Sequence, residues 1–302
     1  MANEEGLTRT EKKIIQPLQK LGVNVRAHEV FLPTSFSAED KNNRIELLEA
    51  FCNRNNIDEI IYHPPIVSDD KYLNKFDLAN PRSKLHEICM NCLYELSEMN
   101  FVEKTNLVVH TLGMSESFCN EKKNEMIKNT LDALKELKKI SKKSAICLEN
   151  NPSDFQSFKM NGTLGMHPKE IKMLVDNANI MACLDLAHFQ IFYEGMLEQN
   201  EVAAREENIY GAIDWDDTAK IYADIIGGAH INDAKGSTVK YEGISVGKGN
   251  VPFEKIIPTI AKKDIFGTFE IIDLHLRPDS MVESVIKIKE IFKEQFFEYF
   301  HS

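Results

Sequence analysis

The sequence predicts an α/β fold, a TIM (β/α)8-type barrel in which parallel strands are enclosed by helices. First, short runs of apolar and β-branched residues alternate with longer amphipathic helical patterns, as in repeated strand–helix units. Second, the polar residues that end successive strands recur every (270 − 63)/5, about 41 residues, which is one strand–helix unit. Third, the short runs are apolar throughout, as in strands covered on both faces.

Seven strands are predicted in chain order, at residues 24–31, 58–65, 106–113, 144–151, 180–188, 227–233 and 267–273. Helical patterns lie between them, at residues 43–55, 82–99, 124–143, 167–178, 214–226 and 252–263, and a last one covers residues 284–300. The chain opens on a helical pattern at residues 8–22, which in a closed eight-stranded barrel would follow a first strand. We therefore expect the first strand to be irregular, within residues 1–8, or missing.

The composition favours one domain. With 302 residues, 43% hydrophobic content and no Gly-, Pro- or Ser-rich tract, the chain can bury one large core. We expect a single barrel domain over residues 1–302, with its core at about 24–290. No apolar run reaches the roughly 18–20 residues of a membrane span and the N-terminus lacks a signal-peptide pattern, so we expect a cytoplasmic protein without a membrane partner.

Six predicted strands end in a histidine or a carboxylate. Because the carboxyl ends of barrel strands converge on one mouth, these side chains are expected to meet there. Their mixed nitrogen and oxygen chemistry suits a divalent metal, zinc or manganese with cobalt as a third choice. The predicted metal ligands are His63, His110, Glu149, Asp185, His230 and Glu270. His28, in the first predicted strand, is a further candidate for the mouth.

Seven short motifs, in order, carry a resemblance to a known family: "YHPP", "VVHTLG", "CLENN", "CLDLAHF", "AHINDAKG", "ISVGKGNVPFEKI" and "FEII". From about residue 24 to 290 the chain resembles the xylose isomerase-like TIM barrels, which include sugar phosphate isomerases and epimerases and endonuclease IV. In the sugar branch, the resemblance implies that one metal is held by the residues matching Glu149, Asp185, His230 and Glu270, and that His188 contacts substrate. In the endonuclease IV branch, the residues matching His63 and His110 bind an additional zinc, bridged by the one matching Glu149.

One departure from the endonuclease IV pattern limits the expected metal count. That branch carries an Asp and a His shortly before a Gly-x-Gly, and these complete a further metal position. This chain has Tyr241 and Gly243 at those places, in "KYEGISVGKGN". Neither residue can replace the missing ligands, so the resemblance implies one or two metals rather than three.

Three functions remain open. In the first, a sugar or sugar-phosphate isomerase or epimerase, the resemblance gives Glu149 and Glu270 proton transfer on opposite sides of a metal-chelated ketose, with His188 orienting a substrate oxygen. The second is a zinc phosphodiesterase of the endonuclease IV (AP endonuclease) type, the only reading with a nucleic-acid partner. The net charge of −11 disfavours a broad nucleic-acid surface but leaves a local basic groove open. The third is a catalytically degenerate metal-binding barrel.

Three cations are candidates for binding a substrate anion: Lys235, Lys248 and Arg277. Lys235 and Lys248 lie in the glycine-containing loop after the seventh strand expected in a full barrel, where such folds often bind phosphate. The alternative is that these glycines only turn the chain. The long connection at residues 193–213 could form a lid or the contact of a homo-oligomer.

Overall fold

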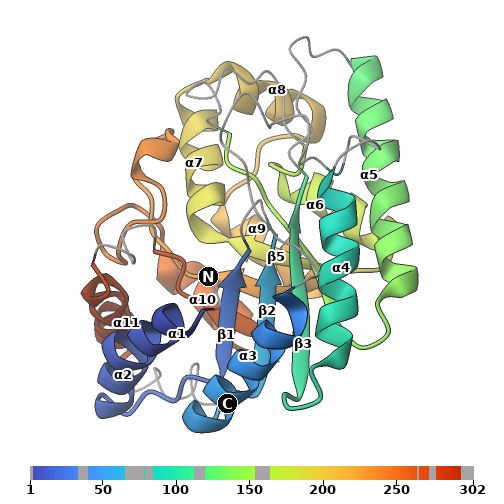
Figure 1. The fold of residues 1–302 in the computed structure, drawn as a ribbon. Helices are drawn as coiled ribbons and strands as arrows, with labels where there is room; N and C mark the ends of the chain where they lie inside the picture. The colour runs from blue at the N-terminus through green and yellow to red at the C-terminus, as the bar shows by residue number, and fades with distance from the viewer. Residues whose placement is uncertain are drawn as a thin grey trace.

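In the computed structural model, the described residues are 3–32, 40–64, 78, 84–111, 120–153, 164–263, 265–271 and 277–293. Seven parallel strands form one sheet in the order β1-β2-β3-β4-β5-β6-β7, curved nearly into a closed barrel with helices around it (Figure 1). The predicted α/β barrel is therefore confirmed.

Each strand within this part of the chain lies where the sequence predicts one. The strands are β1 (Ala27–Phe31), β2 (Glu59–His63), β3 (Lys104–His110), β4 (Ala145–Glu149), β5 (Met181–Asp185), β6 (Ile226–His230) and β7 (Phe266–Thr268). All except β1 stop earlier than predicted.

The helices follow the predicted alternation, with two additions. Those expected are α3 (Lys41–Asn55), α4 (Lys84–Glu98), α5 (Asn120–Ile140), α6 (Pro168–Ala178), α9 (Trp215–Ile225), α10 (Phe253–Ile260) and α11 (Asp279–Phe292). The additions are α7 (Leu186–Leu197) and α8 (Glu201–Tyr210). The end of the last predicted helical pattern, residues 294–300, lies outside the described residues. None of the described helices is both long and apolar enough to cross a membrane.

A short feature explains why α7 begins directly after β5. The Asp185 carboxylate accepts a hydrogen bond from the His188 backbone N–H at 2.7 Å and so caps the helix. Residues 186–188, predicted as the end of a strand, are therefore the first turn of α7. This turn places the His188 side chain over the end of the strand that carries Asp185.

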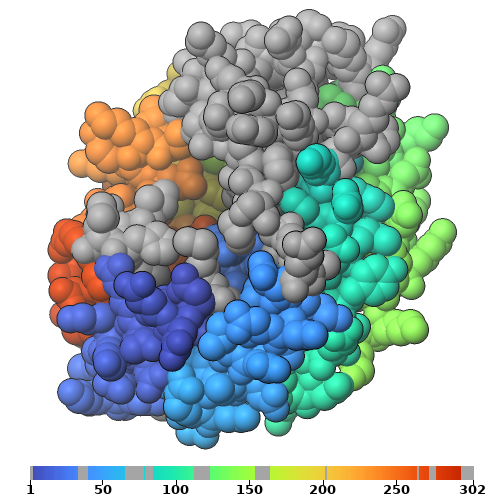
Figure 2. Space-filling view, in the orientation of Figure 1, coloured from blue at the N-terminus to red at the C-terminus, as the bar shows by residue number. Residues whose placement is uncertain are grey.

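The first strand of a full barrel is missing from the described residues. The chain opens instead with α1 (Glu4–Thr10), a π-helical turn (Glu11–Ile15) and α2 (Gln16–Lys20). These helices lie beside α11 (Figure 1), and Lys289 Nζ donates to the Leu21 carbonyl at 3.3 Å. Figure 2 shows the same neighbourhood from outside, with the dark blue N-terminal helices against lighter blue α3. The outer edges of β1 and β7 thus face each other across an open seam.

The interior of the barrel beneath the mouth is apolar. Its layer consists of Ile61, Val108, Cys147, Cys183 and Phe266, all buried. The Phe266 ring fills this space because Gly228 on the neighbouring strand has no side chain; a Cβ there would overlap the ring. Its members on β2 to β5 each lie two positions before the strand-end residue, so this layer is directly beneath the mouth.

Candidate metal centre

The strand-end residues singled out in the sequence converge on one mouth of the barrel. Five of them are the last residues of β2 to β6, and the sixth, Glu270, lies two positions beyond β7. The first five are buried, whereas the Glu270 side chain is 23% exposed. The parallel direction of all seven strands brings them to the same end.

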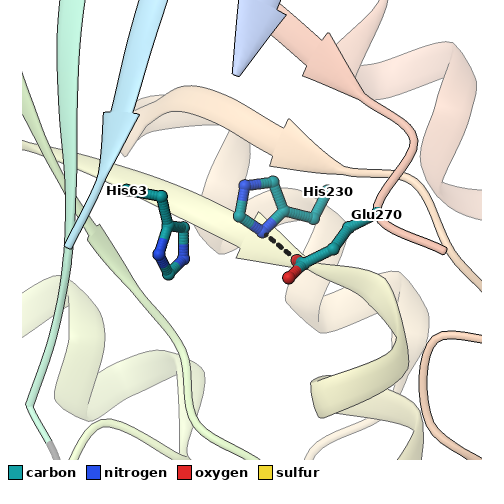
Figure 3. A group of neighbouring side chains, drawn as sticks. All are labelled: His63, His230 and Glu270. Atoms are coloured by element: carbon teal, nitrogen blue, oxygen red, sulfur yellow. Dashed lines mark ion pairs between the residues drawn. The ribbon is translucent and has the colours of Figure 1, made fainter. Parts of the chain in front are cut away.

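Four of these side chains form one group around His230. Its Nδ1 atom lies 3.1 Å from Glu149 Oε1, 2.8 Å from Glu270 Oε2 and 3.6 Å from Asp185 Oδ2. The possible ligand atoms of the four residues all lie within 4.8 Å of one another. Figure 3 shows the Glu270 carboxylate directed at the His230 ring, with His63 on the neighbouring side.

A second group shares Glu149 with the first. Its other oxygen, Oε2, lies 2.8 Å from His110 Nε2 and 3.2 Å from His63 Nε2, and the two nitrogens are 3.2 Å apart. Glu149 therefore contributes one oxygen to each group. A carboxylate in this arrangement could bridge two metal ions.

The outer nitrogen of each site histidine is held by a hydrogen-bond acceptor, which determines the tautomer of the neutral ring. The acceptors are Pro64 O for His63 (2.9 Å), Asn151 Oδ1 for His110 (3.0 Å), Asn150 O for His188 (2.7 Å) and Glu29 Oε1 for His230 (3.1 Å). Carbonyl and carboxylate oxygens only accept, so these ring nitrogens carry the hydrogens. The Asn151 amide is oriented because its Nδ2 donates to the Thr111 and Leu164 carbonyls.

The inner face of the centre therefore consists of acceptors. In their neutral forms the histidines present bare nitrogens to carboxylate oxygens, an arrangement that requires protons or a cation between them. Within the described part of the chain, buried Glu270 Oε2 accepts no hydrogen bond, although His230 Nδ1 is close to it. Residues of this type and placement fit a divalent metal held by nitrogen and oxygen.

The pKa values show how the protein compensates for these charges without a metal. Burial disfavours the charged form of His230, but Cys183 and the surrounding carboxylates outweigh it and raise the pKa well above the ordinary 6.5. Burial likewise opposes ionisation of Glu149, yet His110 and His230 hold its pKa well below 4.5. Burial raises the pKa of Glu270. Protons on the histidines thus occupy the positions that a cation would take.

Sequence reasoning missed Glu242. Glu242 directly follows the short 3-10 helix η5 (Val239–Tyr241). Its Oε1 atom lies 2.9 Å from His188 Nε2. The sequence comparison considered only the flanking positions, Tyr241 and Gly243, where the endonuclease IV pattern has ligands. The signal available was a carboxylate between them, in "KYEG".

Three further contacts were missed in the sequence. Asn150 joins two ligand-bearing strands, since its Nδ2 donates to the Asp185 carbonyl at 3.0 Å and its Oδ1 accepts from the Asp185 N–H at 2.8 Å. Cys183 precedes Asp185 by two residues, faces the same interior and joins a possible ligand group with Glu149 and His230.

Glu29 faces the centre, whereas the neighbouring candidate His28 packs on Phe51 with ring centroids 4.9 Å apart. Burial lowers the pKa of His28 to about 4.

Of the three cations predicted to bind a substrate anion, two lie near the same carboxylate. Lys248 Nζ lies 3.4 Å and Arg277 3.6 Å from the carboxylate of Glu283, while Lys235 is exposed. The glycine amides of the same loop donate inward: Asp233 Oδ2 accepts from Gly247 at 2.9 Å and Gly249 at 2.8 Å. A Cβ at Gly249 would overlap the Ala234 carbonyl, so this glycine permits a close turn.

The barrel fold agrees with a comparison against known families. The family model of the xylose isomerase-like TIM barrel matches residues 15–285. The chain belongs to this family. No curated protein sequence matches the chain significantly.

Solved structures extend the xylose isomerase-like comparison at the level of the fold. A D-tagatose 3-epimerase-like protein has a TM-score of 0.62 at 19% identity, covering 94% of this chain and 92% of its own. An L-ribulose 3-epimerase has 0.60 at 13%, covering 94% and 86%. The IOLI protein with a bound zinc atom has 0.63 at 12%, covering 97% and 94%. Identities this low establish the shared barrel rather than a shared activity.

Proposed function

We propose that the protein is a metal-dependent isomerase or epimerase that acts on a small sugar or sugar phosphate. The observation that carries the proposal is the buried group of Glu149, Asp185, His230 and Glu270 at the barrel mouth. Membership of the xylose isomerase-like family and the fold shared with an L-ribulose 3-epimerase and a D-tagatose 3-epimerase-like protein support it. The metal would be zinc or manganese, with cobalt as a third choice, at one or two ions per chain.

Each residue of the group has a role in this chemistry. The four side chains would hold the metal, which as a Lewis acid would polarise a substrate carbonyl. Glu149 and Glu270 approach from β4 and from beyond β7, so a sugar carbon bound between them would face a carboxylate on either side. One removes a proton from the carbon beside the carbonyl and the other returns one, which inverts or relocates that centre. Partial exposure of Glu270 gives substrate access to it.

His188 would orient the substrate. Its Nδ1–H is fixed on the Asn150 carbonyl and its Nε2 lies beside Glu242, at 2.9 Å. The ring therefore has a single orientation before substrate arrives, which lowers the entropic cost of positioning a sugar oxygen. The predicted anion-binding roles of Lys235, Lys248 and Arg277 belong to the same proposal for a phosphorylated sugar.

One observation favours the second candidate, a zinc phosphodiesterase of the endonuclease IV type. The group formed by His63, His110 and Glu149 offers a further metal position, which a single-metal epimerase does not need. The net charge of −11 opposes a nucleic-acid substrate, because phosphate backbones are bound by clusters of Lys and Arg.

The test combines metal content with proton exchange. Elemental analysis of the purified protein is expected to give one or two equivalents of zinc, manganese or cobalt. Incubation of the metal-loaded protein with a ketose panel in D2O is expected to place deuterium beside the carbonyl. Glu270→Gln should abolish this exchange, whereas Glu290→Gln, on the exposed face of α11, should not. Nicking of abasic-site DNA without sugar exchange would overturn the proposal in favour of the phosphodiesterase.

A further inference from the structure

Glu29 is a buried carboxylate in the middle of β1 that contacts two other strands. Its Oε1 atom accepts from His230 Nε2 at 3.1 Å, and its Oε2 atom accepts from the Thr268 hydroxyl at 2.6 Å. The Glu29 side chain is 5% exposed. Both carboxylate oxygens are therefore engaged, one at β6 and one at β7.

The contact with His230 connects Glu29 to the candidate metal centre. The opposite nitrogen of the same ring, Nδ1, lies among Glu149, Asp185 and Glu270. A carboxylate that accepts the outer N–H of a ligating histidine fixes the ring orientation and makes the inner nitrogen a stronger donor to a metal. The outer nitrogens of His63, His110 and His188 contact carbonyl oxygens, whereas the acceptor at the outer nitrogen of His230 is a carboxylate.

The contact with Thr268 connects Glu29 to the open seam. Among the residues described, the sheet begins at β1 and ends at β7, and no backbone ladder joins these two strands. A cavity of about 920 Å³ lies along this seam, and Glu29, Thr268 and Glu270 all line it. Thr268 ends β7, two positions before Glu270. A side chain that holds Thr268 therefore also fixes the start of the segment that carries Glu270.

We infer that Glu29 is a positioning residue of the metal centre, which orients His230 directly and Glu270 through Thr268. This inference rests on the proposed metal-dependent function. Among the described residues, none of the possible ligand groups includes Glu29. Its effect is on the affinity and the ligand field of a metal bound by its neighbours.

Two substitutions separate the two contacts, and a third serves as a matched control. Glu29→Gln keeps the shape of the side chain but removes the negative charge from the His230 hydrogen bond. Thr268→Val removes only the link to β7. Glu59→Gln changes a buried carboxylate on the adjacent strand β2 that accepts a hydrogen bond from Asn106 Nδ2 at 2.5 Å. All three are compared with the parent protein after their thermal unfolding has been checked.

The probe is Co²⁺, read by titration and by the visible absorption of the loaded protein. Glu29→Gln is expected to weaken Co²⁺ binding about 10- to 100-fold, as for other carboxylates behind a ligating histidine, and to shift the visible bands. Thr268→Val should weaken binding less, and Glu59→Gln should leave affinity and spectrum as in the parent. Parent-like affinity and bands in Glu29→Gln, or an equal loss in Glu59→Gln, would overturn the inference. A parent protein that binds no divalent metal would overturn the proposed function as well.

Discussion

At the scale of single residues, the centre depends on which nitrogen of each histidine carries a hydrogen. The hydrogen is placed on the outer nitrogen by acceptors outside the centre. These are the backbone carbonyls of Pro64 and Asn150, the Asn151 amide oxygen and the Glu29 carboxylate. Because these partners come from the strands themselves or the residues after them, the orientation of the rings is part of the fold. A metal would meet nitrogens that are already directed at it.

The raised histidine pKa values predict how stability depends on pH. Burial lowers the pKa of each ring, but the carboxylates around it outweigh burial, so the folded-state values exceed 6.5 for His63, His188 and His230. The stabilisation that results is complete below pH 6.5 and is lost as pH rises through the raised values, where the folded protein gives up these protons. The melting temperature of the metal-free protein should therefore fall as pH rises above about 6.5.

Metal should reverse this trend, because bound metal and histidine protons compete for the same nitrogens. The increase in melting temperature on adding Zn²⁺ should grow over the same pH range. Thermal unfolding with chelator and with excess Zn²⁺, from pH 6 to 9, measures both effects. A metal-free protein that becomes more stable with rising pH would contradict this account of the site charges.

The gathering of the six predicted ligands at the mouth could be anticipated from the sequence because each follows an apolar run at a regular period. Glu29 could not, since it lies inside a strand and the sequence does not say whether His28 or Glu29 faces the barrel. That choice depends on the register of β1 against β2, which pairs Glu29 with Ile61. Glu242 lies in the loop after β6, whose path depends on contacts that the strand pattern does not reveal, such as that of Asp233 with Val251.

At the scale of elements, α8 is attached to the barrel by a buried charge cluster. Lys123 Nζ lies 2.9 Å from Glu170 Oε1 of α6 and 2.5 Å from Glu206 Oε2 of α8, with all three side chains at most 5% exposed. Tyr210 also donates to Glu170, at 2.9 Å. One lysine on α5 thus holds two carboxylates that would otherwise repel each other.

Removal of that lysine charge is expected to be costly. Lys123→Met leaves Glu170 and Glu206 buried without their shared cation, and such changes cost about 3–5 kcal/mol. Lys128→Met, at an exposed position of the same helix, should change stability by less than about 0.5 kcal/mol. Urea unfolding of both variants tests this, and equal stabilities would mean that the cluster contributes nothing to the docking of α8.

The elements themselves were predictable where their patterns are local. Strands and most helices follow apolar periodicity, so the order of the barrel could be deduced without a structure. The helix α7 was missed because its hydrophobic residues are buried on most sides, which removes the amphipathic pattern. The sequence left two possibilities for the first strand, an irregular strand within residues 1–8 or none. Residues 4–10 form the helix α1 instead, and Asn3 caps this helix by accepting from the Gly6 N–H at 2.8 Å.

At the scale of the whole molecule, the candidate centre joins residues from β2 to β6 and the segment beyond β7. A metal bound there would therefore stabilise the entire barrel rather than one loop. Ligand binding to the folded state alone adds RT ln(1 + [L]/Kd), about 2.7 kcal/mol at a hundredfold excess over Kd. Unfolding of the parent protein should shift upward by this amount with metal, and Asp185→Asn should lose most of the shift. A shift unaffected by Asp185→Asn would place the bound metal elsewhere.

The open seam also has a consequence for the order of folding. Each strand from β1 to β6 pairs with the next strand along the chain, so these contacts join positions that are much closer in sequence. Glu29 and Thr268, by contrast, are separated by 239 positions. Bringing such distant positions together carries a large loop-closure entropy, so contacts across the seam should form last. In refolding from denaturant with Co²⁺ present, far-ultraviolet circular dichroism should recover before the visible absorption of bound metal. Metal absorption that appears first would mean that the ion nucleates the barrel, rather than binding when its two ends have met.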